Sequence, residues 1–128
     1  MYRRLFVVQW KKNYPMKVIF TPHLTPMNRG ILSTAYAKMS KPITTKTLQE
    51  LYRKFYSYER FVRIREKSTH VSPNQVRGSN FCDLGIVGDP RTGNIITVAA
   101  LDNLVKGAAG QAIQSMNLMM GYPEDTGL

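Results

Sequence analysis

Most of the hydrophobic pattern along this chain is that of short strands. In residues 61–65, Val62 and Ile64 alternate with arginines, as they would in a strand with one buried face. Residues 81–87 and 94–101 flank a run of turn residues, which predicts a hairpin. Two further short strands are predicted at residues 17–21 and 31–37, and a polar loop at residues 69–78.

Two segments instead carry the pattern of helices. Residues 44–58 place apolar side chains three and four positions apart, which predicts an amphipathic helix. Thr45 or Thr47 would cap its N-terminus, and Thr47 with Glu50 has the spacing of a capping box. A second helix is predicted from about residue 105 to residue 120, where a glycine and a proline follow as a stop signal.

This order of elements predicts an α+β fold. Strands dominate, with one helix in mid-chain and one at the end, so we expect a mixed, largely antiparallel sheet with helices on one face. A length of 128 residues suits a single domain. No apolar run approaches the roughly 18 residues of a membrane span, and a single cysteine gives no internal disulfide.

The charge of the chain is strongly asymmetric. Residues 1–49 hold nine lysines or arginines and no acid, whereas residues 50–128 hold nine basic and eight acidic residues. The net charge of +10 therefore comes almost entirely from the first part. Five explanations of this basic first part remain open. They are a nucleic-acid arm, a transit peptide, a solvated face, a docking surface for an acidic domain, and a pocket for an anionic substrate. Nucleic acid is the less favoured partner, because no nucleic-acid motif accompanies the charge.

Two segments have residues suited to ligand binding. Pro22 and Pro26 bracket a rigid loop, which places Arg29 where it could clamp a phosphate or a carboxylate. Two glycines, Gly107 and Gly110, weaken the start of the terminal helix, so another backbone or a ligand is expected to approach closely there. The simpler alternatives are a surface arginine on a turn and close packing of the helix on the sheet.

The remaining candidates for chemistry are weaker. Strand alternation places Cys82 on the apolar face, with no basic neighbour to lower its pKa, so we expect a buried structural thiol. His23, between two prolines, is more typical of a structural donor than of a catalyst. The two histidines and the cysteine are scattered, so no metal site is expected.

Three separated motifs nevertheless resemble one family in the correct order. They are residues 20–32 (FTPHLTPMNRGIL), residues 76–83 (VRGSNFCD), and residues 101–114 (LDNLVKGAAGQAIQ), which continue to residue 121. These segments are similar to the C-terminal portion of N-acetyl-gamma-glutamyl-phosphate reductases, which belong to the semialdehyde dehydrogenase superfamily. The resemblance covers about residues 18–128. It implies a catalytic or dimerisation portion at 18–104, and a C-terminal helix at 105–128 that packs on a dinucleotide-binding domain.

The resemblance also implies an activity and a set of roles. The family reduces an acyl phosphate to a semialdehyde with NADPH in arginine biosynthesis, which implies a cytoplasmic enzyme and a homo-oligomer. Carried over by position, Arg29, with His23 and Asn28, would bind the substrate. Asn103, Lys106 and Gly107 would lie near the cofactor, NADP(H), which is bound mainly by the dinucleotide-binding domain. The residues leave open whether the substrate derives from N-acetyl-glutamate or from the related amino-adipate.

Several family features have no counterpart in this sequence. The family's Gly-Cys-Tyr-Pro-Thr nucleophile motif, its catalytic histidine segment and its glycine-rich dinucleotide loop are not found. Residues 1–17, a basic leader, stand where the histidine segment would be. We therefore expect a fragment with no catalytic residue of its own, inactive alone. The alternative is a non-catalytic module that docks on a homologous subunit or binds nucleic acid.

Overall fold

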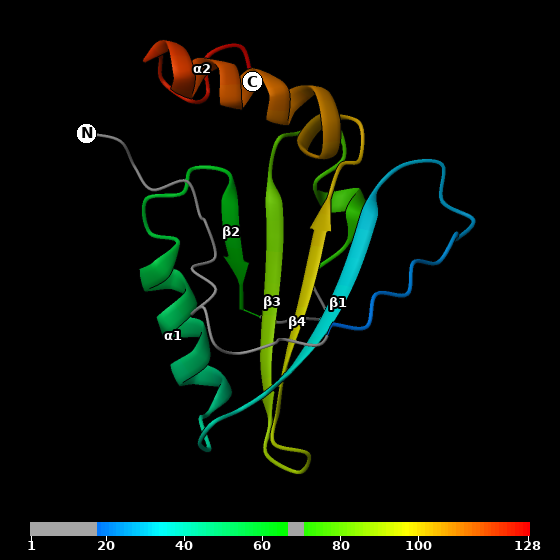
Figure 1. The fold of residues 1–128 in the computed structure, drawn as a ribbon, viewed down its shortest axis with the longest axis vertical. Coiled ribbons are helices and arrows are strands. Elements are labelled where there is room, and N and C mark those ends of the chain that lie inside the picture. The colour runs from blue at the N-terminus through cyan, green and yellow to red at the C-terminus, as the bar shows by residue number, and fades with distance from the viewer. Residues whose placement is uncertain (1–17, 67–70) are drawn as a thin grey trace.

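The computed structural model describes residues 18–66 and 71–128, which form a four-stranded sheet with two main helices (Figure 1). The strand order is β1-β4-β3-β2. The elements are β1 (Ile31–Lys38), α1 (Thr45–Phe55), β2 (Val62–Arg65), β3 (Cys82–Asp89), β4 (Asn94–Leu101), a π-helical turn η3 (Val105–Ala109) and α2 (Gly110–Met120).

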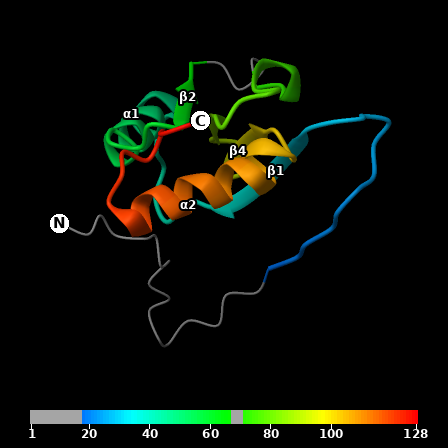
Figure 2. The same cartoon turned by 90° about the horizontal axis from the view of Figure 1, so that it is seen from above.

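The sheet is mixed and largely antiparallel, which confirms the predicted fold class. β4 pairs antiparallel with both β1 and β3, and β2 pairs parallel with β3. α1 packs against β3 on one face, while α2 lies across one end of the sheet (Figures 1 and 2). None of the helices in the described residues is long and apolar enough to cross a membrane.

The apolar core lies between α1 and the sheet. Leu48 of α1 is buried against Leu84 and Ile86 of β3, and Cys82 packs at the edge of this cluster. Leu84, Ile86 and Cys82 alternate along β3, as their two-residue spacing predicts. Complete burial of such an aliphatic side chain contributes about 1.5–3 kcal/mol, so this cluster fixes α1 on the sheet.

The boundaries of α1 differ from the prediction. The N-cap is Thr44, whose Oγ1 accepts a hydrogen bond from the backbone N–H of Thr47 at 3.1 Å. The hydroxyl of Thr45 instead accepts the N–H of Gly88 at 3.0 Å, which ties the helix start to β3. The helix ends at Phe55, three residues early, because the following turn must bring the chain back into β2.

Two further predictions, one of a strand and one of a loop, need correction. The predicted strand at 17–21 is wrong for its described residues, 18–21, which have no strand pairing and are exposed. Seen from above, this segment lies away from the sheet (Figure 2). The composition favours a strand there, but no strand among the described residues pairs with it. The predicted polar loop at 69–78, described from residue 71 onward, buries Val71 and Val76 against Ala100 on the second face of the sheet.

Candidate functional site

A buried carboxylate, Asp102, connects the loops at one end of the sheet. It follows β4 directly and is fully buried. Its oxygens accept backbone N–H bonds from Gly78 at 2.6 Å, from Leu104 at 2.8 Å and from Val105 at 3.1 Å. Nε of Arg29 lies 2.8 Å from Oδ2 of the same carboxylate. One side chain therefore holds the start of η3, the turn at residue 78 and the loop before β1.

The environment of Asp102 keeps it ionised. Burial by itself would raise the pKa of this carboxyl group, because it disfavours the charged form. The hydrogen bond from the Gly78 N–H, the ion pair with the Arg29 guanidinium and the hydrogen bonds from the N–H groups of Leu104 and Val105 outweigh burial. Together they hold the pKa of Asp102 well below its usual range. Asp102 is thus a permanent negative charge at neutral pH, placed directly beside Arg29.

The neighbouring residue, Asn103, fixes the same loop by a second contact. Its Oδ1 accepts the backbone N–H of Gly30 at 2.7 Å. Gly30 has a φ of 114°, and a Cβ at this position would lie 2.5 Å from Cβ of Pro73. A side chain is therefore excluded on both conformational and steric grounds. The loop before β1 and the segment around Pro73 approach each other closely because position 30 is a glycine.

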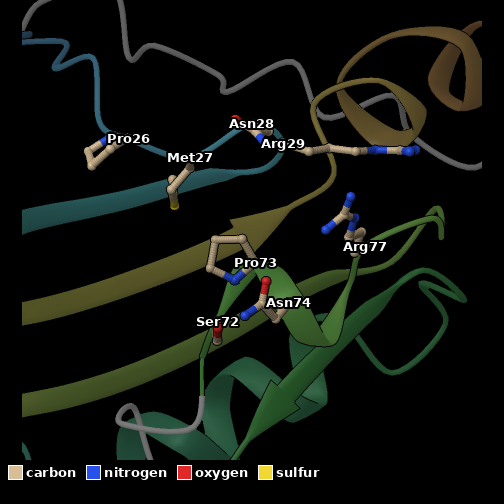
Figure 3. A pocket seen from close by; sticks show the side chains of 8 residues that line it. All are labelled: Pro26, Met27, Asn28, Arg29, Ser72, Pro73, Asn74 and Arg77. Atoms are coloured by element: carbon tan, nitrogen blue, oxygen red, sulfur yellow. The ribbon is translucent and has the colours of Figure 1, made fainter.

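These two segments form the walls of an open cavity of about 280 Å³ (Figure 3). Two arginines, Arg29 and Arg77, line it from different loops, together with neutral polar groups. Of the described residues, no acidic side chain is in the lining. The lining residues are Pro26, Met27, Asn28, Arg29, Ser72, Pro73, Asn74 and Arg77. An excess of positive charge beside amide and hydroxyl groups suits an oxyanion such as a phosphate or a carboxylate.

The structure brings only some of the predicted substrate residues together. Arg29 and Asn28 both line the cavity. His23 does not, since it is exposed and its Nδ1 lies 3.1 Å from the carbonyl oxygen of Thr21. Asp102 and Arg77 are absent from the residues predicted from sequence. The position of Arg77 inside the VRGSN motif, which matches the family, was the available signal.

The predicted cofactor residue Lys106 faces a different, internal cluster. Its Nζ donates a hydrogen bond to Oε1 of Gln114 at 2.6 Å, and the same oxygen accepts a hydrogen bond from Nδ2 of Asn80 at 3.0 Å. Nε2 of Gln114 donates to Glu124 at 3.1 Å. Burial lowers the pKa of Lys106, while the nearby Cys82 and glutamates oppose that change. This network ties η3 and α2 to the C-terminal residues and to the segment before β3.

The two glycines of the terminal helix have different surroundings. A Cβ at Gly110 would lie 2.5 Å from Oδ1 of Asn80, and 2.7 Å from a methyl group of Val105. Close packing within this chain therefore explains why position 110 is a glycine, without a ligand. Gly107 is exposed, and a Cβ there would meet its nearest neighbours at 3.4 Å, an ordinary contact. A methyl group at Gly107 would thus fit against Asp102 and Leu101 without a clash.

Cys82 has a basic neighbour that was not expected from the sequence. Burial raises the pKa of the Cys82 thiol, whereas the charge of Lys106 acts in the opposite direction and Asp83 reinforces the rise. The expectation that no basic residue stands beside it is wrong, because η3 brings Lys106 back over the start of β3. The net effect is still a raised pKa, which is typical of a structural thiol.

The four-stranded mixed sheet with its two helices is consistent with a semialdehyde dehydrogenase dimerisation domain. Residues 7–103 match the family model described as "Semialdehyde dehydrogenase, dimerisation domain", and the chain belongs to this family. The match begins inside residues 1–17, which the sequence motifs had left outside the resemblance.

The similar curated proteins are N-acetyl-gamma-glutamyl-phosphate reductases. The protein of Geobacter sulfurreducens is 57% identical over 111 residues, which cover 87% of this chain and 32% of the relative. That of Geotalea daltonii is 55% identical over 113 residues, 88% of this chain and 33% of the relative. That of Lachnospira eligens is 54% identical over 113 residues, which cover 88% of this chain and 32% of the relative. The resemblance to the C-terminal portion of these reductases is confirmed, and the chain spans about a third of their length.

Proposed function

We propose that this chain works as the C-terminal part of an NADPH-dependent N-acetyl-gamma-glutamyl-phosphate reductase, which reduces an acyl phosphate to a semialdehyde. The observation that carries the proposal is the cavity with Arg29 fixed at its edge by Asp102. The identity of more than half of the aligned residues with reductases of that name supports it independently.

On the substrate side, Arg29 and Asn28 are proposed to hold an anionic end of the acyl phosphate. Asp102 fixes the guanidinium at Nε, so the loss of side-chain entropy on binding is reduced in advance. His23 remains a candidate of the same loop, although its side chain lies outside the cavity lining. It would need a movement of the exposed segment around it to reach the ligand.

On the cofactor side, Asn103, Lys106 and Gly107 are proposed to lie near NADPH, which supplies the hydride when bound. Gly107 is exposed and has no side chain, so a flat ring can approach its backbone from the solvent side. Oδ1 of Asn103 is already engaged by Gly30, so its Nδ2 amide is the group that would donate to the cofactor. Lys106 would act through its charge, because its Nζ is held by Gln114.

The proposal requires a partner that supplies the nucleophile, the catalytic histidine and the main dinucleotide site. We propose that this partner is the dinucleotide-binding portion of the reductase, that the assembly is a homo-oligomer in the cytoplasm, and that the chain alone is inactive. The name of the family, a dimerisation domain, supports the expectation of a second copy.

Reconstitution tests the proposal. The chain would be mixed with, and separately fused to, the N-terminal two thirds of the Geobacter sulfurreducens reductase, and NADPH oxidation would be followed with N-acetyl-gamma-glutamyl phosphate. We expect activity only when both parts are present. Arg29→Ala should lower kcat/KM for the acyl phosphate by roughly tenfold or more, with the KM for NADPH unchanged.

The matched control is Arg91→Ala, an exposed arginine in the β3–β4 turn at the opposite end of the sheet. It removes the same charge without touching the cavity. Folded, assembled protein without acyl-phosphate-dependent oxidation would reject the proposal, as would activity of the chain alone. An equal loss in both arginine variants would show that overall charge, rather than the cavity, is responsible.

A further inference from the structure

We infer that Arg77 is the principal anion-binding cation of this cavity, and that it contacts an oxyanion of the ligand beside Arg29. The inference deepens the proposed function, on which it rests for the identity of the substrate. Arg77 lies in the turn that follows η2 (Pro73–Gln75), on the wall opposite the loop of Arg29. Figure 3 shows its side chain rising from that wall toward the side chain of Arg29.

The first support is the balance of charge. Arg29 is paired with the buried Asp102 at 2.8 Å, so its charge is largely offset within the chain. In the described part of the chain, no hydrogen bond or ion pair engages the guanidinium of Arg77, which is exposed. Two arginines and one carboxylate leave one uncompensated positive charge, and that charge belongs to Arg77. An incoming anion would therefore interact most strongly with Arg77.

The second support is that the backbone beside Arg77 is held in place. The N–H of Gly78, the next residue, donates to Oδ2 of Asp102 at 2.6 Å, and Val76, the preceding residue, is completely buried. The same Oδ2 lies against Arg29. One carboxylate oxygen thus sets the spacing between the two loops from which the arginines project. The guanidinium of Arg77 is free, but its attachment point is fixed.

The chemistry of the lining defines the ligand class. Asn28, Asn74 and Ser72 supply neutral polar groups around the two guanidinium groups. A cavity of about 280 Å³ that is open to solvent accommodates a small anion, and planar guanidinium groups match the oxygens of a phosphate or a carboxylate. An acyl phosphate derived from an N-acyl amino acid offers both groups, so the test must separate them.

The experiment is an amide NMR titration of the whole chain, with inorganic phosphate in one series and N-acetyl-L-glutamate in the other. We expect the amide resonances of residues 72–78 and 28–30 to shift on addition of anion. The anion that binds with the lower dissociation constant identifies whether the cavity prefers a phosphate or a carboxylate. Arg77→Ala should weaken binding of that anion by roughly tenfold or more. Arg77→Lys, which keeps a charge but loses the planar fork, should recover part of the affinity.

Arg91→Ala is again the control, and it should bind like the unmodified chain. Unchanged spectra outside the cavity would establish that the variants are folded, and Arg77→Lys serves if the alanine variant is not. Equal affinity in Arg77→Ala and in the unmodified chain, or no shift at residues 72–78 with either anion, would overturn the inference. Binding is measured on the chain itself, so a failed reconstitution of the reductase would reject the proposed function while leaving this result intact.

Discussion

Oδ2 of Asp102 lies 2.8 Å from Nε of Arg29 and 2.6 Å from the backbone nitrogen of Gly78. The carboxylate is fully buried, whereas the arginine that it holds reaches the edge of an open cavity. A charge that would be costly to bury alone is stabilised by three N–H groups and a guanidinium. Through these contacts, Asp102 holds two loops that are far apart in the sequence on opposite sides of one cavity.

The first prediction concerns the charge of Asp102. Its folded pKa is depressed, so its contribution to stability is present above the unfolded pKa, ordinarily about 3.9, and is lost as the pH falls through the folded value. Asp102→Asn should be clearly less stable than the unmodified chain at pH 7. The difference should shrink as the pH falls below about 4, because the unfolded state of the unmodified chain then binds a proton at Asp102 that the folded state does not.

Urea unfolding between pH 7 and pH 3 measures this difference. Glu50→Gln on the exposed side of α1 is the control, since it removes one acidic charge far from the cavity. A stability difference for Asp102→Asn that stays constant over the whole pH range would contradict the prediction. It would show that the variant is destabilised by altered packing or hydrogen bonding and not by the loss of the carboxylate charge.

The second prediction compares two glycines in the terminal helix. Replacing a helical glycine by alanine normally stabilises a helix by about 1 kcal/mol. Gly110→Ala should instead destabilise the chain by about 1–3 kcal/mol, because its Cβ would lie 2.5 Å from Oδ1 of Asn80. Gly107→Ala, with its nearest contacts at 3.4 Å, should be neutral or stabilising. Thermal unfolding of both variants would decide, and the reverse order would refute the internal packing of Gly110.

The third prediction concerns the start of α1. Thr44 caps this helix by accepting the N–H of Thr47, so Thr44→Ala should lower the free energy of unfolding by about 1 kcal/mol. Lys46→Ala, an exposed change in the first turn without a cap contact, serves as the control. Equal unfolding free energies for the two variants would show that Thr44 does not act as the cap.

The sequence predicts local features well and long-range ones poorly. The β3–β4 hairpin follows from a pattern within a few residues, and the structure has it. The apolar side of α1 is only half right, because Leu48 and Tyr52 pack in the core. Leu51 and Phe55, predicted on the same side, are more than half exposed. The strand expected at residues 17–21 depends on a pairing partner, which local composition does not reveal. The roles of Asp102 and Arg77 follow from contacts between loops that are far apart in the sequence, although Arg77 lies in a motif that matches the family. Lys106 lies beside Cys82 for the same reason.

The last prediction concerns the outer surface of α2. Gln114, which is buried, accepts a hydrogen bond from Asn80 of the domain, and the buried Asn117 donates to the C-terminal residues after the helix. Large apolar side chains of α2 face solvent. Met119 is 80% exposed, and Met116, Leu118 and Met120 are each about half exposed or more. Such a surface on a short helix is typical of a contact with another domain. We expect the dinucleotide-binding portion of the reductase to cover it.

Met119→Glu should therefore leave the thermal stability of the chain within about 0.5 kcal/mol of the unmodified value, because the side chain has few contacts to lose. The same change should weaken association with the N-terminal portion of the Geobacter sulfurreducens reductase by roughly tenfold or more, since it places a charge in an apolar interface. Ser57→Glu adds the same charge at an exposed position after α1 and should leave association unchanged. Calorimetric titration measures all three affinities. If Met119→Glu binds as tightly as Ser57→Glu, α2 does not contact that portion, and hydrogen exchange across residues 110–120 should then be identical in the free and the mixed protein.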